Sequence, residues 1–309
     1  MTISEIHALF LKSHDVCTDT RNITKDCLFI ALKGANFDGN KFAYKAIESG
    51  ARYALVDDKA HITSNQTILV SNTLETLQQL ANYHRRFLNI PIVALTGSNG
   101  KTTTKELIAS VLSKKYNTVA TIGNLNNHIG VPLTLLSMNK TTEIGIVEMG
   151  ANHLKEIELL ASIAEPDYGY ITNFGKAHLE GFGGMKGVIK GKSELYQFLE
   201  KTNGKAFVNP NDSLQLEKTE HVTSLLLNSK ISLANSNPFL EIQYDSQILK
   251  TNLIGAYNFS NILAAMSIGE YFEVAKKDIQ EAIVAYVPTN NRSQIVRKGA
   301  HTLLLDAYN

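Results

Sequence analysis

Residues 96–103 have the composition of a loop that binds phosphate groups. The stretch reads Thr-Gly-Ser-Asn-Gly-Lys-Thr-Thr, follows an apolar run of strand type and precedes an amphipathic helical pattern. Two glycines let the backbone bend until several N–H groups point at one anion, and the helix N-terminus adds partial positive charge. The lysine would reach the β- and γ-phosphates of a nucleotide, and the threonine after it would lie on Mg²⁺. The candidate nucleotide-binding residues here are Gly97, Ser98, Asn99, Gly100, Lys101, Thr102 and Thr103.

The match to the general phosphate-loop pattern is incomplete. That pattern has an additional glycine five residues before Gly100, where this chain has Leu95. The alternative is a tight turn that contains Gly-Lys-Thr by chance. Because the motif lies between a buried strand and the start of a helix, we favour the nucleotide interpretation.

Three further candidates for phosphate or metal chemistry come later in the chain, two of them after predicted strands. Glu148 comes directly after the strand predicted over 144–147 and suits a Mg²⁺ ligand, since hard cations prefer oxygen; helix capping is the alternative. His178 follows the strand predicted over 168–172, and Lys192 lies on a helix predicted over 187–200. Taken alone, these two are more simply interpreted as a structural histidine and a solvated charge.

Polar loops contain the other candidate ligands. Three side-chain amides in the loop 123–132 suit a sugar or a peptide, although an ordinary turn also explains them. Two N-terminal loops are interpreted as solvated turns when taken alone, and capping of the helix predicted over 259–272 accounts for one of its two asparagines. The residues concerned are Asn124, Asn126 and Asn127 in the first loop; Asp19, Thr20, Arg21, Asn36, Asp38 and Gly39 near the N-terminus; Asn258 and Asn261 at the helix; and Arg292 and Asp306 in later segments.

The elements that position these residues predict an α/β fold. Residues 1–85 form a small α/β unit, and a helix over 74–88 leads out of it. From residue 91 strands and helices alternate, which predicts a mostly parallel sheet with ligands at the carboxyl ends of its strands. The remaining predictions are strands at 118–122 and 206–208, a hairpin of 240–244 with 248–253, a helix at 277–286 and a last buried strand at 302–305.

Composition narrows the classes of function. The chain has 309 residues, 44% of them hydrophobic and 19% charged, and its formal net charge is +1, which argues against a protein that binds nucleic acid through phosphate neutralisation. It contains no apolar run of membrane-spanning length and no secretory signal pattern. Cys17 and Cys27 lack metal-site spacing, so we expect two reduced thiols in a cytoplasmic protein.

Taken together, these motifs resemble the Mur ligases of peptidoglycan synthesis over nearly the whole chain. The phosphate loop is similar to the variant of that family, which accounts for Leu95. The stretch from Asn124 to Leu136 resembles the member that joins D-alanyl-D-alanine to the UDP-N-acetylmuramoyl-tripeptide. Further resemblance is carried by residues 148–151, 172–180, 255–261, Arg292 and 306–309.

The resemblance implies a function for each part of the chain. Residues 1–85 would bind the UDP-sugar substrate through Asp19, Thr20, Arg21, Asn36, Asp38 and Gly39, and residues 86–309 would form the central ATP-binding domain of P-loop ATPase type. Catalysis would involve Lys101, His178 and Lys192, and Mg²⁺ would be held by Thr102, Glu148, His178 and Lys192, the last as a carbamate. Asn258 and Asn261 would lie by the adenine, Arg292 near phosphate and Asp306 on the ribose.

The implied reaction has two steps. The tripeptide carboxylate attacks the γ-phosphate of ATP to give an acyl phosphate, and the amine of D-alanyl-D-alanine then displaces phosphate. Lys101, Mg²⁺ and the loop dipoles would offset the repulsion between a carboxylate and a polyphosphate.

Mur ligases also carry a third, C-terminal domain that closes over ATP. The sequence stops at Asn309 inside a motif that leads into it. We therefore expect this chain to be a fragment that ligates poorly or not at all, and we expect it to be a monomer.

Other functions stay open at this point. A relative that adds the third peptide residue would use the dipeptide substrate instead of the tripeptide. A non-catalytic nucleotide-binding protein would keep the phosphate loop, with Glu148, His178 and Lys192 incidental. A small-molecule kinase is a weaker third option, because no lid or phosphoacceptor site is evident.

Overall fold

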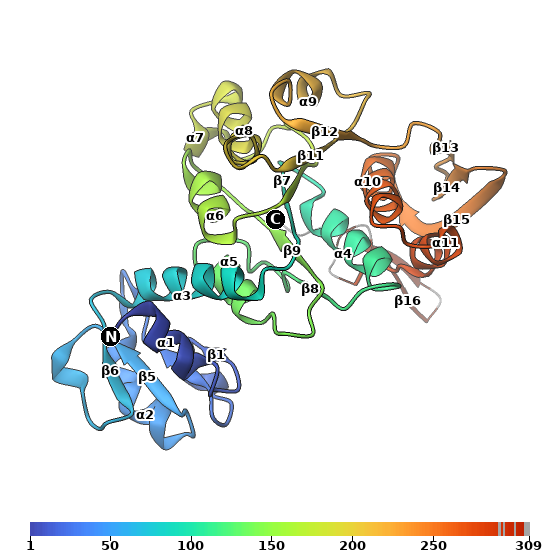
Figure 1. The fold of residues 1–309 in the computed structure, drawn as a ribbon. Coiled ribbons are helices and arrows are strands. Elements are labelled where there is room, and N and C mark those ends of the chain that lie inside the picture. Colours follow the sequence, from blue (N-terminus) through green and yellow to red (C-terminus); the bar gives the residue numbers. More distant parts are fainter. Residues whose placement is uncertain (290–291, 293, 300, 306–309) are drawn as a thin grey trace.

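The computed structural model describes residues 1–289, 292, 294–299 and 301–305, and it has the expected α/β architecture (Figure 1). The N-terminal part contains a four-stranded parallel sheet in the order β1-β2-β5-β6. Its elements are α1 (Ile3–Phe10), β1 (Val16–Cys17), β2 (Leu28–Ile30), β3 (Lys33–Gly34), β4 (Phe37–Asp38), α2 (Ala43–Glu48), β5 (Tyr53–Val56) and β6 (Thr67–Leu69), with 3₁₀ turns at Thr20–Asn22, Gly39–Phe42 and Lys59–His61.

The central part contains a six-stranded sheet in the order β12-β11-β10-β7-β9-β8, with every neighbouring pair parallel. Its strands are β7 (Ile92–Thr96), β8 (Thr118–Ala120), β9 (Ile144–Glu148), β10 (Tyr168–Ile171), β11 (Lys205–Val208) and β12 (Thr223–Leu226). In the register, Leu95 of β7 pairs with Glu148, and Thr96 pairs with Ile171. The end of β7 therefore lies between the ends of β9 and β10, as expected for ligand-binding strand tips.

Helices cover both faces of the central sheet (Figure 1). Along β7, Ile92 and Ala94 join one hydrophobic cluster while Val93 and Leu95 join another, so alternate side chains are buried on opposite faces. The first cluster includes α3 (Thr73–Leu88), α5 (Gly130–Leu136), α6 (Glu156–Ala164) and α8 (Met185–Thr202), and the second includes α4 (Lys101–Leu112), α10 (Asn258–Tyr271) and α11 (Lys276–Ala285). The short helices α7 (Leu179–Phe182) and α9 (Ser213–Lys218) follow strands β10 and β11.

Antiparallel strands complete the described part of the chain. The expected hairpin is confirmed as β14 (Phe239–Tyr244) and β15 (Gln247–Ile254), which β13 (Ser232–Asn235) extends. The prediction of a last buried strand at 302–305 was wrong in one respect. The strand exists as β17 (His301–Leu305) and pairs with β16 (Gln294–Lys298). Leu303 and Leu304 are 44% and 59% exposed, because the two strands form a sheet separate from the six-stranded one.

Helix α3 lies between the two parallel sheets and packs on α1, α5 and α6 (Figure 1). One hydrophobic cluster contains residues of both parts, for example Leu55 and Val147, with Leu80 of α3 between them in sequence. A chain of ring nitrogens also connects the parts: His7 Nε2 lies 3.0 Å from His84 Nδ1, and His84 Nε2 lies 2.9 Å from the Met138 carbonyl oxygen. The division of the chain at residues 85 and 86 falls within α3 and stays a prediction.

Candidate active site

The phosphate-loop sequence forms the predicted strand, turn and helix. Strand β7 ends at Thr96, and α4 begins at Lys101 after Gly100, whose φ is +78°. Gly97 has a φ of +146°, and a Cβ there would lie 2.0 Å from Thr172 Oγ1. Both positions therefore require glycine, for backbone conformation and for space.

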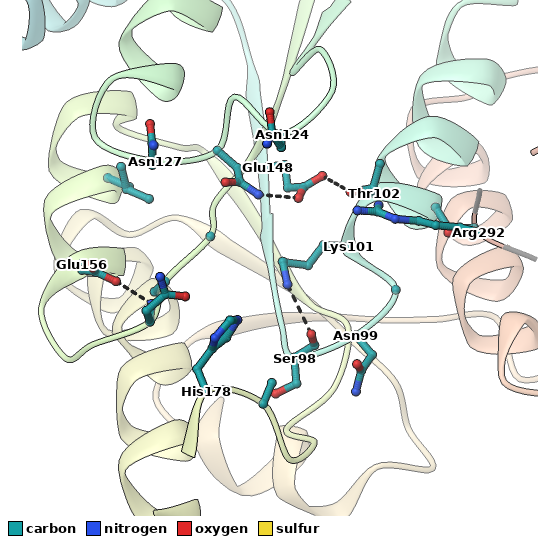
Figure 2. Close-up of a pocket in the computed structure, with 18 of the residues that line it drawn as sticks. Ser98, Asn99, Lys101, Thr102, Asn124, Asn127, Glu148, Glu156, His178 and Arg292 are labelled. Carbon is teal, nitrogen blue, oxygen red and sulfur yellow. Dashed lines mark hydrogen bonds between the residues drawn. The ribbon is translucent and has the colours of Figure 1, made fainter. Parts of the chain in front are cut away.

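A cavity of about 920 Å³ opens where β7, β9 and β10 end (Figure 2). It brings together most of the residues predicted for the nucleotide and the metal, with the three loop asparagines predicted for the substrate: Ser98, Asn99, Gly100, Lys101, Thr102, Thr103, Asn124, Asn126, Asn127, Glu148, His178, Asn258, Asn261 and Arg292. It also has lining residues without a predicted role, among them His128, Asn152, Glu156 and Tyr257.

Lys101 points into the loop that precedes it. Its Nζ donates to the carbonyl oxygen of Gly97 at 2.8 Å and to that of Ser98 at 3.3 Å, the second of which is drawn in Figure 2. Burial lowers the pKa of Lys101, and the nearby Glu148 carboxylate opposes that shift. The ammonium group is therefore held next to the backbone that would surround a phosphate.

Glu148 is a buried carboxylate at the cavity. It is 1% exposed, its Oε2 accepts from Thr102 Oγ1 at 2.9 Å, and its Oε1 accepts from Asn126 Nδ2 at 2.8 Å (Figure 2). These partners exclude the helix-capping interpretation. A hydroxyl and a carboxylate that meet beside a phosphate loop form an oxygen donor set that fits Mg²⁺. Among the described residues, no group of three or more His, Cys, Asp or Glu side chains surrounds a single metal position.

In the loop 123–132, some side-chain amides stabilise the turn itself and others contact the candidate metal ligand. Asn126 binds Glu148, and Asn127 Oδ1 accepts from the backbone N–H groups of Ile129 and Gly130 at 3.1 and 2.9 Å. The turn interpretation therefore accounts for Asn127, while Asn126 orients a candidate metal ligand.

His178 and Lys192 lie beyond the end of β10 and on α8. His178 lines the cavity with a φ of +50°, and burial together with the charges of Lys192 and Lys101 lowers its pKa. Lys192 is 1% exposed and its Nζ donates to the Ala151 carbonyl oxygen at 3.2 Å, so the interpretation as a solvated charge was wrong. Burial, reinforced by the charge of Lys101, lowers the pKa of Lys192 to about 7. Lys192 lies outside the set of described residues that line the cavity.

Asn258 and Asn261 connect α10 to the phosphate-loop helix. Asn261 Nδ2 donates to Asn258 Oδ1 at 2.8 Å, and Asn261 Oδ1 accepts from Thr104 Oγ1 at 3.0 Å. Asn258 Nδ2 donates to the Ile254 carbonyl oxygen at 2.9 Å. The capping interpretation was wrong, because Tyr257 occupies the N-cap position of α10 and makes no side-chain capping bond.

The six N-terminal candidates are placed away from this cavity, which none of them lines in the described part of the chain. Asp19 is paired with Arg21 and accepts from its backbone N–H at 2.9 Å, and Asp38 accepts from the Asn40 backbone N–H at 3.1 Å. A Cβ at Gly39 would lie 2.5 Å from the Leu32 carbonyl oxygen. Turn formation explains these contacts, and a role for Asp19, Thr20, Arg21, Asn36, Asp38 and Gly39 in substrate binding stays a prediction. Asp306 lies outside the described residues.

Comparison of the sequence with models of known protein families assigns the chain to a family. Residues 12–93 match the model described as the catalytic domain of the Mur ligase family, and residues 95–269 match the Mur ligase middle domain. The chain belongs to the Mur ligase family.

Named relatives align with most of the length of this Mur ligase. The UDP-N-acetylmuramoyl-tripeptide–D-alanyl-D-alanine ligase of Escherichia coli (strain K12) is 37% identical over 95% of this chain, which covers 68% of that protein. The ligase of the same name from Bacillus subtilis (strain 168) is 33% identical over 96% of this chain, which covers 67% of it. This Mur ligase therefore spans about two thirds of their length.

Solved structures agree with this assignment of the fold. A crystal structure of MurF from Acinetobacter baumannii is 28% identical, with a TM-score of 0.85 over 100% of this chain and 73% of that one. The MurF ligase of Thermotoga maritima in complex with ADP is 27% identical, with a TM-score of 0.81 over 97% of this chain and 72% of that one. No described helix of this Mur ligase is long and apolar enough to cross a membrane.

Proposed function

We propose that this Mur ligase joins D-alanyl-D-alanine to UDP-N-acetylmuramoyl-tripeptide with consumption of ATP, in peptidoglycan precursor synthesis. The observation that carries the proposal is the meeting of Lys101, Thr102 and Glu148 in one cavity at three neighbouring strand ends. The printed names of the relatives supply the substrates, and the ADP complex of a similar ligase supports a nucleotide in this cavity.

In the proposed reaction, the protein's groups hold the phosphates and balance their charge. The tripeptide carboxylate attacks the γ-phosphorus, the bond to the β-phosphate oxygen breaks, and ADP leaves. The amine of D-alanyl-D-alanine then attacks the acyl phosphate, loses a proton and displaces inorganic phosphate. Lys101 exchanges its loop carbonyl partners for phosphate oxygens, and the N–H groups at the start of α4 bind the same anion.

Thr102 and Glu148 would hold Mg²⁺, and His178, which lines the same cavity, would be a further ligand. When bound, the ion supplies charge neutralisation for the polyphosphate. Asn126 fixes the Glu148 carboxylate from its other oxygen, so the ligand needs little rearrangement to receive a cation.

Lys192 fits the proposed carbamate because its amine is buried and its pKa is lowered to about 7. An amine of that pKa is substantially neutral near pH 7, and only the neutral form adds to carbon dioxide. Carbamylation would also replace an unfavourable buried cation with an anion beside Lys101, which is a favourable exchange of charge.

The remaining assignments stay predictions. Asn258 and Asn261 would lie by the adenine, with Arg292 near phosphate and Asp306 on the ribose, and the loops around Asp19 and Asp38 would bind the UDP-sugar. Cytoplasmic location, a monomeric state and the need for a further domain are likewise predictions.

Two measurements test the function. Calorimetry should detect one Mg-ATP site, and Lys101→Ala should weaken it about 10- to 100-fold through loss of a charged hydrogen-bond donor. Product analysis with ATP, D-alanyl-D-alanine and each UDP-substrate should give product with the tripeptide, at a low rate if a further domain is needed, and none with the dipeptide. Ligation of the dipeptide instead would favour the relative that adds the third residue, and Mg-ATP binding that survives Lys101→Ala would contradict the proposed site.

A further inference from the structure

The segment that follows β10 holds the phosphate loop from one side. The side-chain amide of Asn173 pairs with the backbone of Asn99: the Asn99 N–H donates to Asn173 Oδ1 at 3.2 Å, and Asn173 Nδ2 donates to the Asn99 carbonyl oxygen at 3.0 Å. One side chain therefore satisfies both backbone groups of a loop residue, in the way that a neighbouring strand would.

Three more hydrogen bonds join the same two segments. Thr172 Oγ1 donates to the Asn99 carbonyl oxygen at 2.6 Å, and the Ser98 N–H donates to the Asn173 carbonyl oxygen at 3.1 Å. Ser98 Oγ donates to the Gly175 carbonyl oxygen at 2.7 Å. Thr172 is 5% exposed, and only a glycine at position 97 leaves room for its hydroxyl. The segment 172–175 therefore fits the loop in shape as well as in hydrogen bonding.

The geometry of one peptide unit gives these contacts a functional consequence. The Asn99 carbonyl and the Gly100 N–H belong to a single planar trans peptide, in which the two groups point in opposite directions. Fixing the carbonyl oxygen toward Thr172 and Asn173 therefore aims the Gly100 N–H away from β10. Gly100 lines the cavity and precedes Lys101, so this N–H is the first of the run that would meet a phosphate.

We propose that Asn173 is a positioning residue that sets the Asn99–Gly100 peptide in the orientation that receives nucleotide phosphate. The inference rests on the proposed function, because it presumes that a nucleotide binds at this loop. Without the amide, the Asn99 carbonyl loses one of its two side-chain donors, and the Asn99 N–H, which belongs to the preceding peptide, loses its acceptor. Rotation of the Asn99–Gly100 peptide then competes with phosphate binding.

The test compares ligands with and without phosphate. Calorimetry measures dissociation constants for ADP with Mg²⁺ and for adenosine, in the wild-type protein and in Asn173→Ala. The constant for ADP should rise about tenfold, since two neutral hydrogen bonds are lost, while that for adenosine should stay the same. Thr172→Val, which removes the second donor to the same carbonyl at nearly unchanged volume, should raise the ADP constant several-fold.

Asn82→Ala is the matched control. Asn82 also binds backbone through its amide, at the Ser162 and Ile163 carbonyl oxygens, but it is not among the described residues that line the cavity or contact the phosphate loop, so its loss should leave both constants unchanged. Unfolding midpoints of all variants show that they are folded, and Thr172→Val carries the test should Asn173→Ala fail to fold.

Three results would overturn the inference. An ADP constant within about twofold of wild type in Asn173→Ala and Thr172→Val would show that the peptide needs no such support. An equal loss of ADP and adenosine binding would show a general structural role. If the wild-type protein binds neither ligand, the proposed function fails as well, so that outcome is distinct from the other two.

Discussion

Lys192 shows at the residue scale how a basic side chain comes to be buried. It follows Val188 by four residues and precedes Leu195 by three, and both are fully buried on α8. Position 192 therefore belongs to the apolar stripe of that helix. Its Nζ lies 5.2 Å from the centroid of the Phe182 ring and donates to the Ala151 carbonyl oxygen. The protein keeps a costly side chain here, which is typical of a functional position.

Replacing this lysine should separate stability from function. We expect Lys192→Met to raise the free energy of unfolding by roughly 1–4 kcal/mol, because it removes a buried charge without leaving a void, and to abolish ligation. Below about pH 7 the folded wild type must bury the charged form. From pH 7 to 10.5 the folded amine is neutral while the unfolded one still binds a proton, so wild-type stability rises and the advantage of Lys192→Met shrinks.

Denaturant unfolding at several pH values checks this prediction. Lys190→Met, on the exposed side of the same helix, is the control and should change stability by less than about 0.5 kcal/mol. A destabilised Lys192→Met, or full ligation by it, would contradict the assignment.

At the scale of elements, α6 depends on α8 for its N-terminus. The residue before α6 is Lys155, with a φ of +72° and no side-chain capping bond. The carboxylate of Glu194 on α8 replaces that cap, because it accepts from the N–H groups of Lys155 and Glu158 at 2.7 and 3.0 Å. An anion at this position also complements the helix dipole.

Removal of this cap should loosen the wall of the cavity that α6 forms. We expect Glu194→Ala to lower the free energy of unfolding by about 1–3 kcal/mol, since two backbone donors lose a charged acceptor. Thermal unfolding measures the loss. Glu158→Ala, which removes only an exposed pair with Lys155, should cost less than about 1 kcal/mol. Equal losses in the two variants would show that the interhelix cap is unimportant.

The sequence patterns predicted the helices and strands better than they predicted the contacts between side chains. Alternating strands and helices were sufficient for the parallel sheet and for the strand ends that carry Lys101 and Glu148, because both follow from periodicity. The burial of Lys192 had a signal in its spacing from Val188 and Leu195. No sequence signal predicted the contacts of Asn126 and Asn173. These contacts form between loop side chains that meet only after β9 and β10 align beside β7.

At the scale of the whole molecule, paired histidines couple the two sheets. His7 on α1 and His84 on α3 are 4% and 2% exposed, and their hydrogen bonds lead to the Met138 carbonyl. Burial, with a smaller contribution from His84, lowers the pKa of His7 to about 4, and burial also lowers that of His84. Both rings are therefore neutral in the folded protein near pH 7.

The pair should make the protein sensitive to acid. Between the ordinary histidine pKa of 6.5 and about 4, the unfolded chain binds protons that the folded chain does not, so stability should fall as pH decreases through this range. Replacing both residues, as in His7→Gln with His84→Gln, should flatten this part of the stability curve. His221→Gln, at an exposed histidine, should leave the curve unchanged, and an equally steep curve in the double variant would contradict the prediction.

The contacts of Lys101 have a consequence for the energetics of nucleotide uptake. Its ammonium ion is already stripped of most of its water and rests on two carbonyls of its own loop. When a triphosphate binds, the ammonium ion exchanges these carbonyl acceptors for phosphate oxygens. The free-energy cost of removing its water has already arisen during folding, so it does not reduce the affinity for the nucleotide. Nucleotide binding therefore requires little further loss of water at this cation. The free-energy cost of dehydrating it lowers the stability of the protein without ligand instead.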